Sequence, residues 1–179
     1  MRTKTKRLIL RSGLLILMLG LIGFTLYNNH SKKYSSFQNE LNKGEVPPAF
    51  SLEVINSEDR INVSDLKGKV VLINFWGSWC EPCKREMPAI QSVYDKYHTS
   101  GFEVLAINLE ESPFVVNQFS NQLDVTFPIL LDPKGEVSER YNIYNLPASL
   151  LLGRDGKIKQ IHEGELNQHT LVKWVTNNL

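Results

Sequence analysis

Apolar residues fall into short runs separated by polar turns along the last two thirds of the chain. The most compact run is VVLINF at 70–75, whose β-branched residues predict a strand buried on both faces. Runs with shorter or alternating patterns predict further strands at 50–54, 60–63, 102–108, 128–131, 149–152 and 157–161. Segments of helical character are expected at 80–98, 113–121, 137–141 and 167–178. Strands that alternate with helices and end in a hairpin and a helix predict an α/β sandwich around a mixed sheet.

The beginning of the chain has a different pattern. Five basic residues and no acid occupy the first eleven positions, and the stretch 13–27 is uncharged and almost wholly apolar. Together with 8–10, this stretch approaches the roughly 20 residues that cross a bilayer as a helix. We therefore expect a signal anchor at 1–27 that leaves the amino terminus in the cytoplasm and the rest of the chain outside the cell membrane.

A cleaved signal peptide has a similar pattern, but no A-x-A-like cleavage site follows Tyr27, which favours an uncleaved anchor. The polar segment 28–45 is expected to be a tether. The domain proper is expected at 46–179.

The chain has 179 residues and a formal net charge of +1, so its overall charge does not indicate a nucleic-acid partner. Its two cysteines, Cys80 and Cys83, stand in the motif WCEPC. A bridge across so short a loop restrains little of the unfolded chain, so the pair is expected to serve chemistry rather than stability.

The placement of these cysteines predicts how they react. Cys80 is expected at a helix amino terminus, where free N–H groups and the helix dipole stabilise a thiolate. Cys80 would attack a partner disulfide, and the more buried Cys83 would resolve the mixed disulfide. The charge of Glu81 is expected to oppose thiolate formation and so to favour reduction. Glu86, three positions after Cys83, has the spacing either of a proton acceptor for Cys83 or of a surface residue in a charged run.

Other functions of the cysteine pair remain open. Zinc usually needs four ligands, and the chain has no second cysteine pair and no ligand-like spacing among His98, His162 and His169. A copper-handling chaperone, a disulfide oxidase or isomerase, and a static disulfide are alternatives. A peroxiredoxin would have threonine where Gly77 stands.

The segment NFWGSWCEPCKREMP at 74–88 resembles the active-site segment of thioredoxin-like proteins. With the basic start, the apolar stretch, LKGKVVLINFW and NLPASLLL, the chain is most similar to the membrane-anchored ResA/TlpA group. The resemblance implies a thioredoxin-like fold with an N-terminal β-hairpin and an inserted helix–strand unit at about 113–131. It further implies reduction of disulfides outside the membrane. No cofactor or metal is expected.

The resemblance also suggests partners. A typical substrate of such proteins is the oxidised C-x-x-C-H of apocytochrome c, so a role in cytochrome c maturation is expected. Related members act in spore formation, which leaves spore or cell-envelope proteins as alternative substrates. Electrons are expected from a membrane thiol carrier of the CcdA or DsbD type.

The resemblance assigns roles to five residues. Cys80 matches the attacking cysteine and Cys83 the resolving cysteine. Pro147 matches a cis-proline that faces the pair and helps to hold substrate. Glu86 matches an acid linked to thiol proton transfer, and Glu111 a second acid near the site.

The chain also departs from the pattern. Asn74 stands where ordinary thioredoxins have a buried aspartate, so proton transfer is expected to fall to Glu86. Ala148 and Ser149 replace a common Thr-Thr after the proline, and Glu110 replaces a common glycine.

Overall fold

The computed structural model describes residues 18, 20–22, 24 and 41–179. The chain divides into two compact units, Met1–Asn39 and Glu40–Leu179. In the first unit, the few described residues are helical. The rest of the predicted anchor at 1–27, and the predicted tether as far as residue 40, lie outside the described residues. Within the described part of the chain, no helix combines the length and the apolar character needed to cross a membrane.

Seven strands form one mixed sheet in the described part of the second unit, in the order β2-β1-β5-β4-β3-β6-β7. The central strands β3, β4 and β5 run parallel, and the other neighbouring pairs run antiparallel. The strands are β1 (Ser51–Val54), β2 (Arg60–Asn62), β3 (Val70–Trp76), β4 (Phe102–Leu109), β5 (Ile129–Asp132), β6 (Ala148–Leu152) and β7 (Ile158–Glu163).

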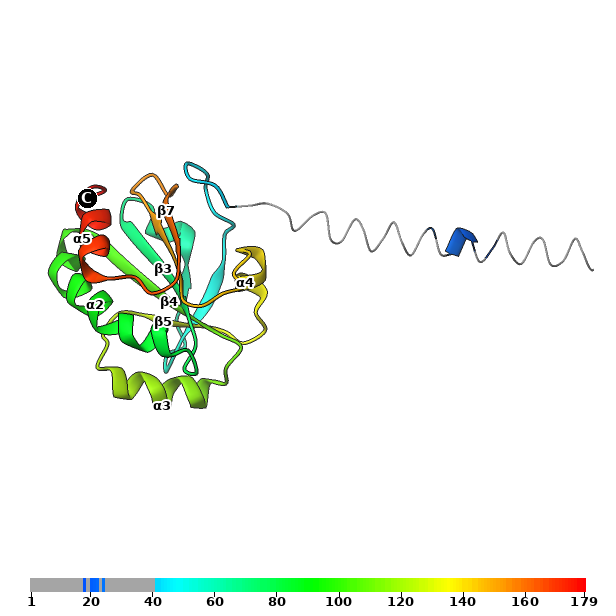
Figure 1. The fold of residues 1–179 in the computed structure, drawn as a ribbon, viewed down its shortest axis with the longest axis horizontal. Helices are drawn as coiled ribbons and strands as arrows, with labels where there is room; N and C mark the ends of the chain where they lie inside the picture. The colour runs from blue at the N-terminus through cyan, green and yellow to red at the C-terminus, as the bar shows by residue number, and fades with distance from the viewer. Residues whose placement is uncertain (1–17, 19, 23, 25–40) are drawn as a thin grey trace, which may run out of the picture. The chain divides into compact units, whose positions relative to one another are not determined.

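Helices cover both faces of this sheet, as Figure 1 shows, with α2 and α5 on one side and α4 on the other. The α-helices are α2 (Glu81–Tyr97), α3 (Pro113–Leu123), α4 (Glu136–Arg140) and α5 (Gln168–Thr176), and two short 3₁₀ helices are η1 (Val63–Leu66) and η2 (His98–Ser100). The predicted α/β sandwich around a mixed sheet is confirmed.

The sheet separates two hydrophobic cores. One core packs α2, α3 and α5 against the sheet, and the other packs α4 and the start of the domain against the opposite face. All seven residues of β3 are buried, as the run at 70–75 predicts. Because every side chain of β3 is buried, and all but Asn74 belong to one hydrophobic core or the other, the end of this strand is a rigid base for the residues that follow it.

The N-terminal hairpin and the inserted unit are both present. β1 and β2 pair in antiparallel register, with Ser51 opposite Asn62. The unit expected at 113–131 consists of α3 and β5, and β5 lies between β1 and β4 in the sheet. The insertion therefore joins the hairpin to the central strands.

The segment before β1 is fastened to the domain. The Tyr141 hydroxyl donates to the Pro48 carbonyl at 2.7 Å, and Arg140 donates to the Ala49 carbonyl at 2.8 Å. Gly44 and Glu45, the last residues of the predicted tether, exchange backbone hydrogen bonds with Ile158 at the start of β7. The backbone thus pairs with the sheet just before the Pro-Pro dipeptide.

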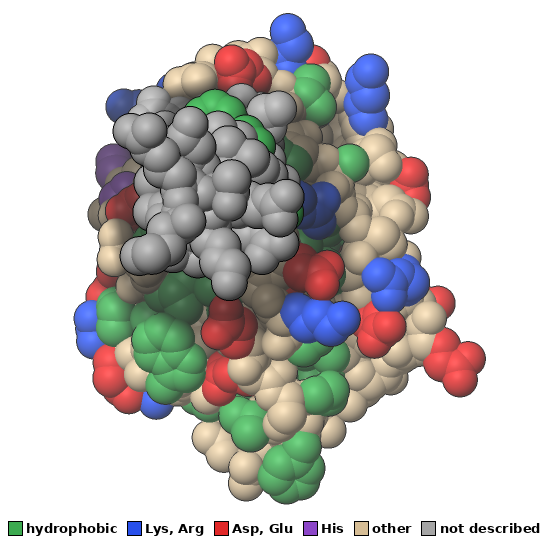
Figure 2. All heavy atoms as spheres, turned by 90° about the vertical axis from the view of Figure 1, so that its right-hand side faces the viewer, with side chains coloured by type: hydrophobic (Ala, Val, Ile, Leu, Met, Phe, Trp, Pro, Cys, Tyr) green, Lys and Arg blue, Asp and Glu red, His purple; other side chains and the backbone are tan. Residues whose placement is uncertain are grey.

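Several predicted boundaries shift by one or two residues. Val63 was expected in a strand, but its N–H binds the Phe50 carbonyl at the end of the hairpin ladder and the residue begins η1. β7 extends to Glu163, beyond the predicted 161, because its antiparallel pairing with β6 continues to Ala148. On the face of the molecule that carries α4, basic and acidic side chains are interspersed (Figure 2), in keeping with the near-neutral net charge.

Candidate active site

The two cysteines lie where the central strand passes into a helix. β3 ends at Trp76, and Cys80 is the N-cap of α2, followed by Pro82 in the first turn. Cys80 and Cys83 form a disulfide, and the Cys83 N–H donates to Cys80 Sγ at 3.3 Å. The predicted position at a helix amino terminus is confirmed, with Cys80 5 % exposed and Cys83 fully buried. A thiolate formed at Cys80 therefore meets the free N–H groups of the first turn of α2.

Glu81, between the cysteines, has a cationic partner. The Lys84 ammonium lies 2.7 Å from its carboxylate and 5.4 Å from the centre of the Phe119 ring. The hydrogen bond from Lys84 holds the pKa of the Glu81 carboxyl below its usual value. The sequence alone predicts that the negative charge of Glu81 opposes thiolate formation at Cys80. In the structure, the positive charge of Lys84 lies beside that negative charge.

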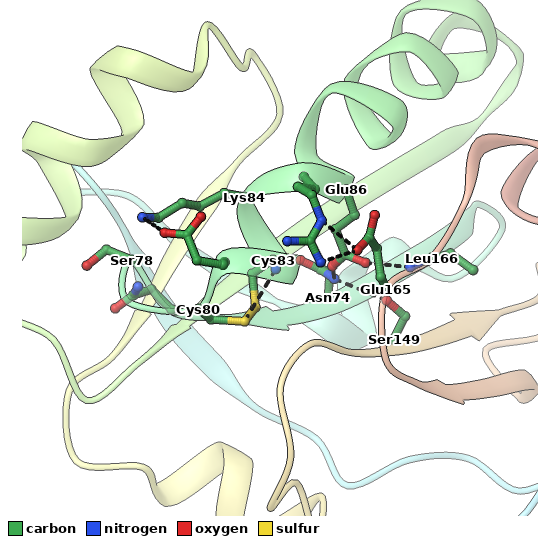
Figure 3. Close-up of a disulfide and its surroundings, with 12 residues drawn as sticks. Asn74, Ser78, Cys80, Cys83, Lys84, Glu86, Ser149, Glu165 and Leu166 are labelled. Atoms are coloured by element: carbon green, nitrogen blue, oxygen red, sulfur yellow. Dashed lines mark hydrogen bonds and ion pairs between the residues drawn. A yellow bond between two sulfur atoms is a disulfide. The ribbon is translucent and has the colours of Figure 1, made fainter.

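Glu86 lies inside the protein rather than on its surface. Its side chain is 1 % exposed, and each carboxylate oxygen accepts one hydrogen bond of 2.7 Å, from Asn74 Nδ2 of β3 and from the Leu166 N–H of the loop after β7. Asn74 Nδ2 also donates to Ser149 Oγ of β6 at 3.1 Å. Figure 3 shows Asn74, Ser149 and Leu166 grouped with Glu86 to the right of the disulfide.

This buried position changes the acidity of Glu86. Burial, which disfavours the ionised form, raises the pKa of its carboxyl from 4.5 to about 7, against the opposing effect of the hydrogen bonds from Leu166 and Asn74. Glu86 therefore can accept or release a proton near neutral pH, as general acid–base chemistry requires.

Pro147 lies at the start of β6. The Leu146–Pro147 peptide bond is cis, as the resemblance implies. The next residue, Ala148, pairs with Phe75 of β3, so the proline stands beside the end of the strand that leads to the cysteines. Its carbonyl accepts a hydrogen bond of 2.8 Å from Gly164.

Glu111 is bonded directly to the loop that carries the cysteine motif. One carboxylate oxygen accepts from the Ser78 N–H at 2.6 Å and from Asn108 Nδ2 at 2.7 Å, and the other accepts from the Ser78 hydroxyl. The backbone of the loop between β3 and α2 is therefore tied to the end of β4. Glu111 is a positioning residue for the site in this geometry, since it contacts Ser78 rather than the sulfur atoms.

Large aromatic side chains are exposed on three segments linked to this site. Trp79, next to Cys80, is 67 % exposed, and Tyr144, three residues before Pro147, is 79 % exposed. Phe114, on the first turn of α3 after Glu111, is 77 % exposed. Gly77 allows the Trp79 indole to lie against the loop, because a Cβ at Gly77 would be 2.8 Å from the indole nitrogen.

Sequence reasoning named the two cysteines, Glu86, Glu111 and Pro147 as candidate site residues, but missed several of their partners. Those partners are Ser78, which bonds to Glu111, and Leu166, which bonds to Glu86. Ser149 and Glu165, bonded to Asn74 and Arg85, were missed as well. Of these contacts, strand patterns could have indicated only that of Asn74 with Ser149, because the pairing of β3 with β6 sets the two residues opposite each other. Within the described residues, no group of three or more His, Cys, Asp or Glu side chains is arranged to hold a metal ion.

Comparisons with known proteins agree with this geometry. Residues 44–161 match the AhpC/TSA family. The chain is 36 % identical over 172 residues to the thiol–disulfide oxidoreductase ResA of Bacillus cereus, covering 96 % of each chain. It is also 36 % identical to ResA of Bacillus subtilis over 165 residues, covering 92 % of this chain and 89 % of that protein.

Solved structures show the same fold. A Chlorobium tepidum structure described as a thiol:disulfide interchange protein DsbE superposes with a TM-score of 0.73 at 31 % identity, over 78 % of this chain and 99 % of that one. StoA from Bacillus subtilis superposes with a TM-score of 0.63 at 35 % identity, over 72 % of this chain and 97 % of that one. With the cysteine pair at the start of α2, these matches show that the chain belongs to the AhpC/TSA family and to its ResA-like thiol–disulfide oxidoreductases of thioredoxin-like fold.

Proposed function

We propose that this oxidoreductase works as a reductant of partner proteins outside the cytoplasmic membrane, with the oxidised C-x-x-C-H segment of apocytochrome c as its substrate. The observation that carries the proposal is the buried Glu86, on the same helix as Cys83, with a pKa near 7. The resemblance to the ResA/TlpA group supports the substrate and the location. Electrons would come from a membrane thiol carrier of the CcdA or DsbD type.

The reaction starts from the reduced pair. The Cys80 thiolate attacks one sulfur of the substrate disulfide, forms a mixed disulfide and releases the other substrate sulfur as a thiolate, which takes up a proton. The Cys83 thiolate then attacks Cys80 Sγ and releases the second substrate thiol. Two electrons have moved to the substrate, and the enzyme is left with the Cys80–Cys83 disulfide that this structure holds. A dithiol donor returns it to the reduced form.

Glu86 serves the second of these steps. Cys83 is fully buried, so its thiol needs a proton acceptor inside the protein before it can attack. Asn74 cannot be that acceptor, because an amide does not ionise near neutral pH. Glu86 lies one helical turn after Cys83 and exists in both protonation states near pH 7. It therefore takes the Cys83 proton as the mixed disulfide is resolved and passes it on to the departing substrate thiolate.

The surface around the motif suits a polypeptide substrate. Trp79, Tyr144 and Phe114 each expose two thirds or more of their side chains. Exposed aromatic residues beside a reactive centre are typical of surfaces that bind other proteins. The exposed Trp79 directly before Cys80 therefore supports a protein rather than a small molecule as substrate.

A trapping experiment tests the proposal. Cys83→Ala leaves Cys80 able to attack but removes the resolving thiol, so substrates should accumulate as mixed disulfides with Cys80. The matched control, Cys80→Ala with Cys83→Ala, should trap nothing. Adducts are isolated from cells, released with a thiol reductant and identified by mass spectrometry.

Recovery of apocytochromes c with the single variant alone would support the proposal. Recovery of spore or cell-envelope enzymes instead would assign the chain another substrate class, and equal recovery with both variants would contradict an attack by Cys80. A copper-handling function predicts instead that the reduced protein binds Cu(I), and that Cys80→Ser abolishes this binding.

The location is tested with the same variant. Cys83→Ala has Cys80 as its only thiol. A membrane-impermeant maleimide should label Cys80 in intact cells to the same extent as in lysed cells. Labelling confined to lysed cells would contradict an extracytoplasmic domain.

A further inference from the structure

Glu86 is bonded to a loop that has a second attachment to the same helix. The loop after β7 brings the Leu166 N–H to 2.7 Å from Glu86 Oε2. The preceding residue, Glu165, accepts hydrogen bonds of 2.9 and 2.7 Å from Nε and Nη2 of Arg85. Two consecutive residues of α2 thus bind two consecutive residues of the loop.

We propose that Arg85 and Glu165 are positioning residues, which hold the loop against α2 so that the Leu166 N–H stays on the Glu86 carboxylate. The proposal deepens the function proposed above and rests on the role given there to Glu86. It assigns a purpose to an ion pair that contacts neither the sulfur atoms nor a substrate.

The pair contributes little to the fold by itself. The Arg85 and Glu165 side chains are 58 % and 41 % exposed, and ion pairs this exposed are weak and screened by salt. Its neighbour Glu86, in contrast, is buried, where one hydrogen bond or one nearby charge has a larger effect. A weak surface interaction can therefore adjust the acidity of a buried group without determining stability.

The direction of the effect follows from the contacts. The negative charge of Glu165 raises the pKa of Glu86, and the hydrogen bond from Leu166 lowers it. Removing Arg85 leaves the charge of Glu165 uncompensated and frees the loop that carries Leu166. Both changes disfavour the ionised form of Glu86, so both raise its pKa.

Few other charged groups surround Glu86 in the described part of the chain. α2 contributes Arg85, and the loop contributes Glu165. β7 contributes His162, whose Nε2 lies 3.4 Å from the Glu165 carbonyl oxygen. The sheet contributes the uncharged Asn74 and, through it, Ser149.

The test measures Glu86 directly. The full chain is labelled with ¹³C at the glutamate carboxyls and titrated by NMR in the disulfide form, with Glu86→Gln used to assign the signal. Arg85→Gln should raise the titration midpoint of Glu86 by about half a pH unit, the size expected for an exposed charge and one loosened hydrogen bond.

Lys84→Gln is the matched control, since it removes one positive charge from the adjacent position of the same helix, where the side chain pairs with Glu81 instead. It should leave the Glu86 midpoint within about 0.2 pH units of the parent, because its contacts do not reach the loop. Exchanging the two partners, Arg85→Glu with Glu165→Arg, restores an ion pair and should return the midpoint to the parent value or below.

An unchanged midpoint in Arg85→Gln, or an equal shift in Lys84→Gln, would overturn the proposal. A restored pair that keeps the raised midpoint would do the same. The role of Glu86 itself is tested separately, by the pH dependence of the rate at which Cys83 resolves a mixed disulfide. If Glu86→Gln leaves that profile unchanged, the proposed proton transfer is wrong, whereas the NMR result for Arg85 and Glu165 is unaffected.

Discussion

Replacing Glu86 by glutamine should change how the stability of the protein depends on pH. In the folded protein, burial raises the pKa of Glu86 to about 7, against its ordinary value of 4.5. Below pH 4.5 the side chain is neutral whether the chain is folded or unfolded. As the pH rises from there, the unfolded chain loses this proton first, so the free energy of unfolding falls until the folded protein has lost it too, at about pH 7.

The size of this effect follows from the difference between the two pKa values. At about 1.4 kcal/mol per pH unit, a pKa of about 7 in place of 4.5 corresponds to about 3 kcal/mol of stability lost between pH 4 and pH 8. Glutamine carries no charge at any pH, so the variant lacks this loss. Its amide can accept from Leu166 and donate to Asn74 Oδ1, which is buried without a partner in the structure.

Urea denaturation of the oxidised protein at several pH values measures the effect. The free energy of unfolding of Glu86→Gln, relative to the parent, should rise by about 3 kcal/mol from pH 4 to pH 8. Glu139→Gln makes the same substitution at an exposed position and should show little change with pH. A difference between Glu86→Gln and the parent that stays constant across this range would refute the argument that Glu86 is a buried acid ionising near neutral pH.

Two further substitutions test the polar groups around the cysteines. Asn74→Asp replaces the amide that donates to Glu86 at 2.7 Å with a second buried carboxyl, so the two carboxyls should share one proton. The upper apparent pKa of this pair should be at least one unit above the pKa of Glu86 in the parent. A ¹³C NMR titration in which no carboxyl ionises above pH 8 would count against this. Glu111→Gln weakens the charge-assisted hydrogen bonds from Ser78 and should lower the free energy of unfolding by about 1–2 kcal/mol, as measured by urea denaturation. The control Glu110→Gln, at the exposed neighbouring position, should have little effect. Equal losses in these two variants would show that Glu111 does not stabilise the loop.

The position of the cysteine pair follows from local sequence. The apolar run before Trp76 makes a strand, and the first turn of α2 forms where Pro82 is tolerated. With the helix beginning at Glu81, Cys80 is its N-cap residue. This part of the site depends on neighbours in the chain, so hydrophobic pattern and turn chemistry were sufficient to predict it.

The environment of Glu86 could not be predicted in this way. Spacing on α2 left a surface glutamate and a proton acceptor equally plausible. Only packing buries the side chain, because β3, β6 and the loop after β7 all meet at this point. The ion pair of Glu81 with Lys84 differs in kind, because residues three positions apart on one helix are neighbours and their spacing in the sequence already predicts the contact.

The sequence by itself determined the α/β order, the buried central strand, the hairpin and the reactive pair, because each depends on local pattern. The inserted unit was expected only from the resemblance to the ResA/TlpA group. The tertiary structure decided the acidity of Glu86, the attachment of Ser78 to Glu111 and the pairing of Arg85 with Glu165. These contacts join residues 33 to 80 positions apart. A pKa depends on burial and on the charges and donors that folding brings close, and these are properties of the packed chain.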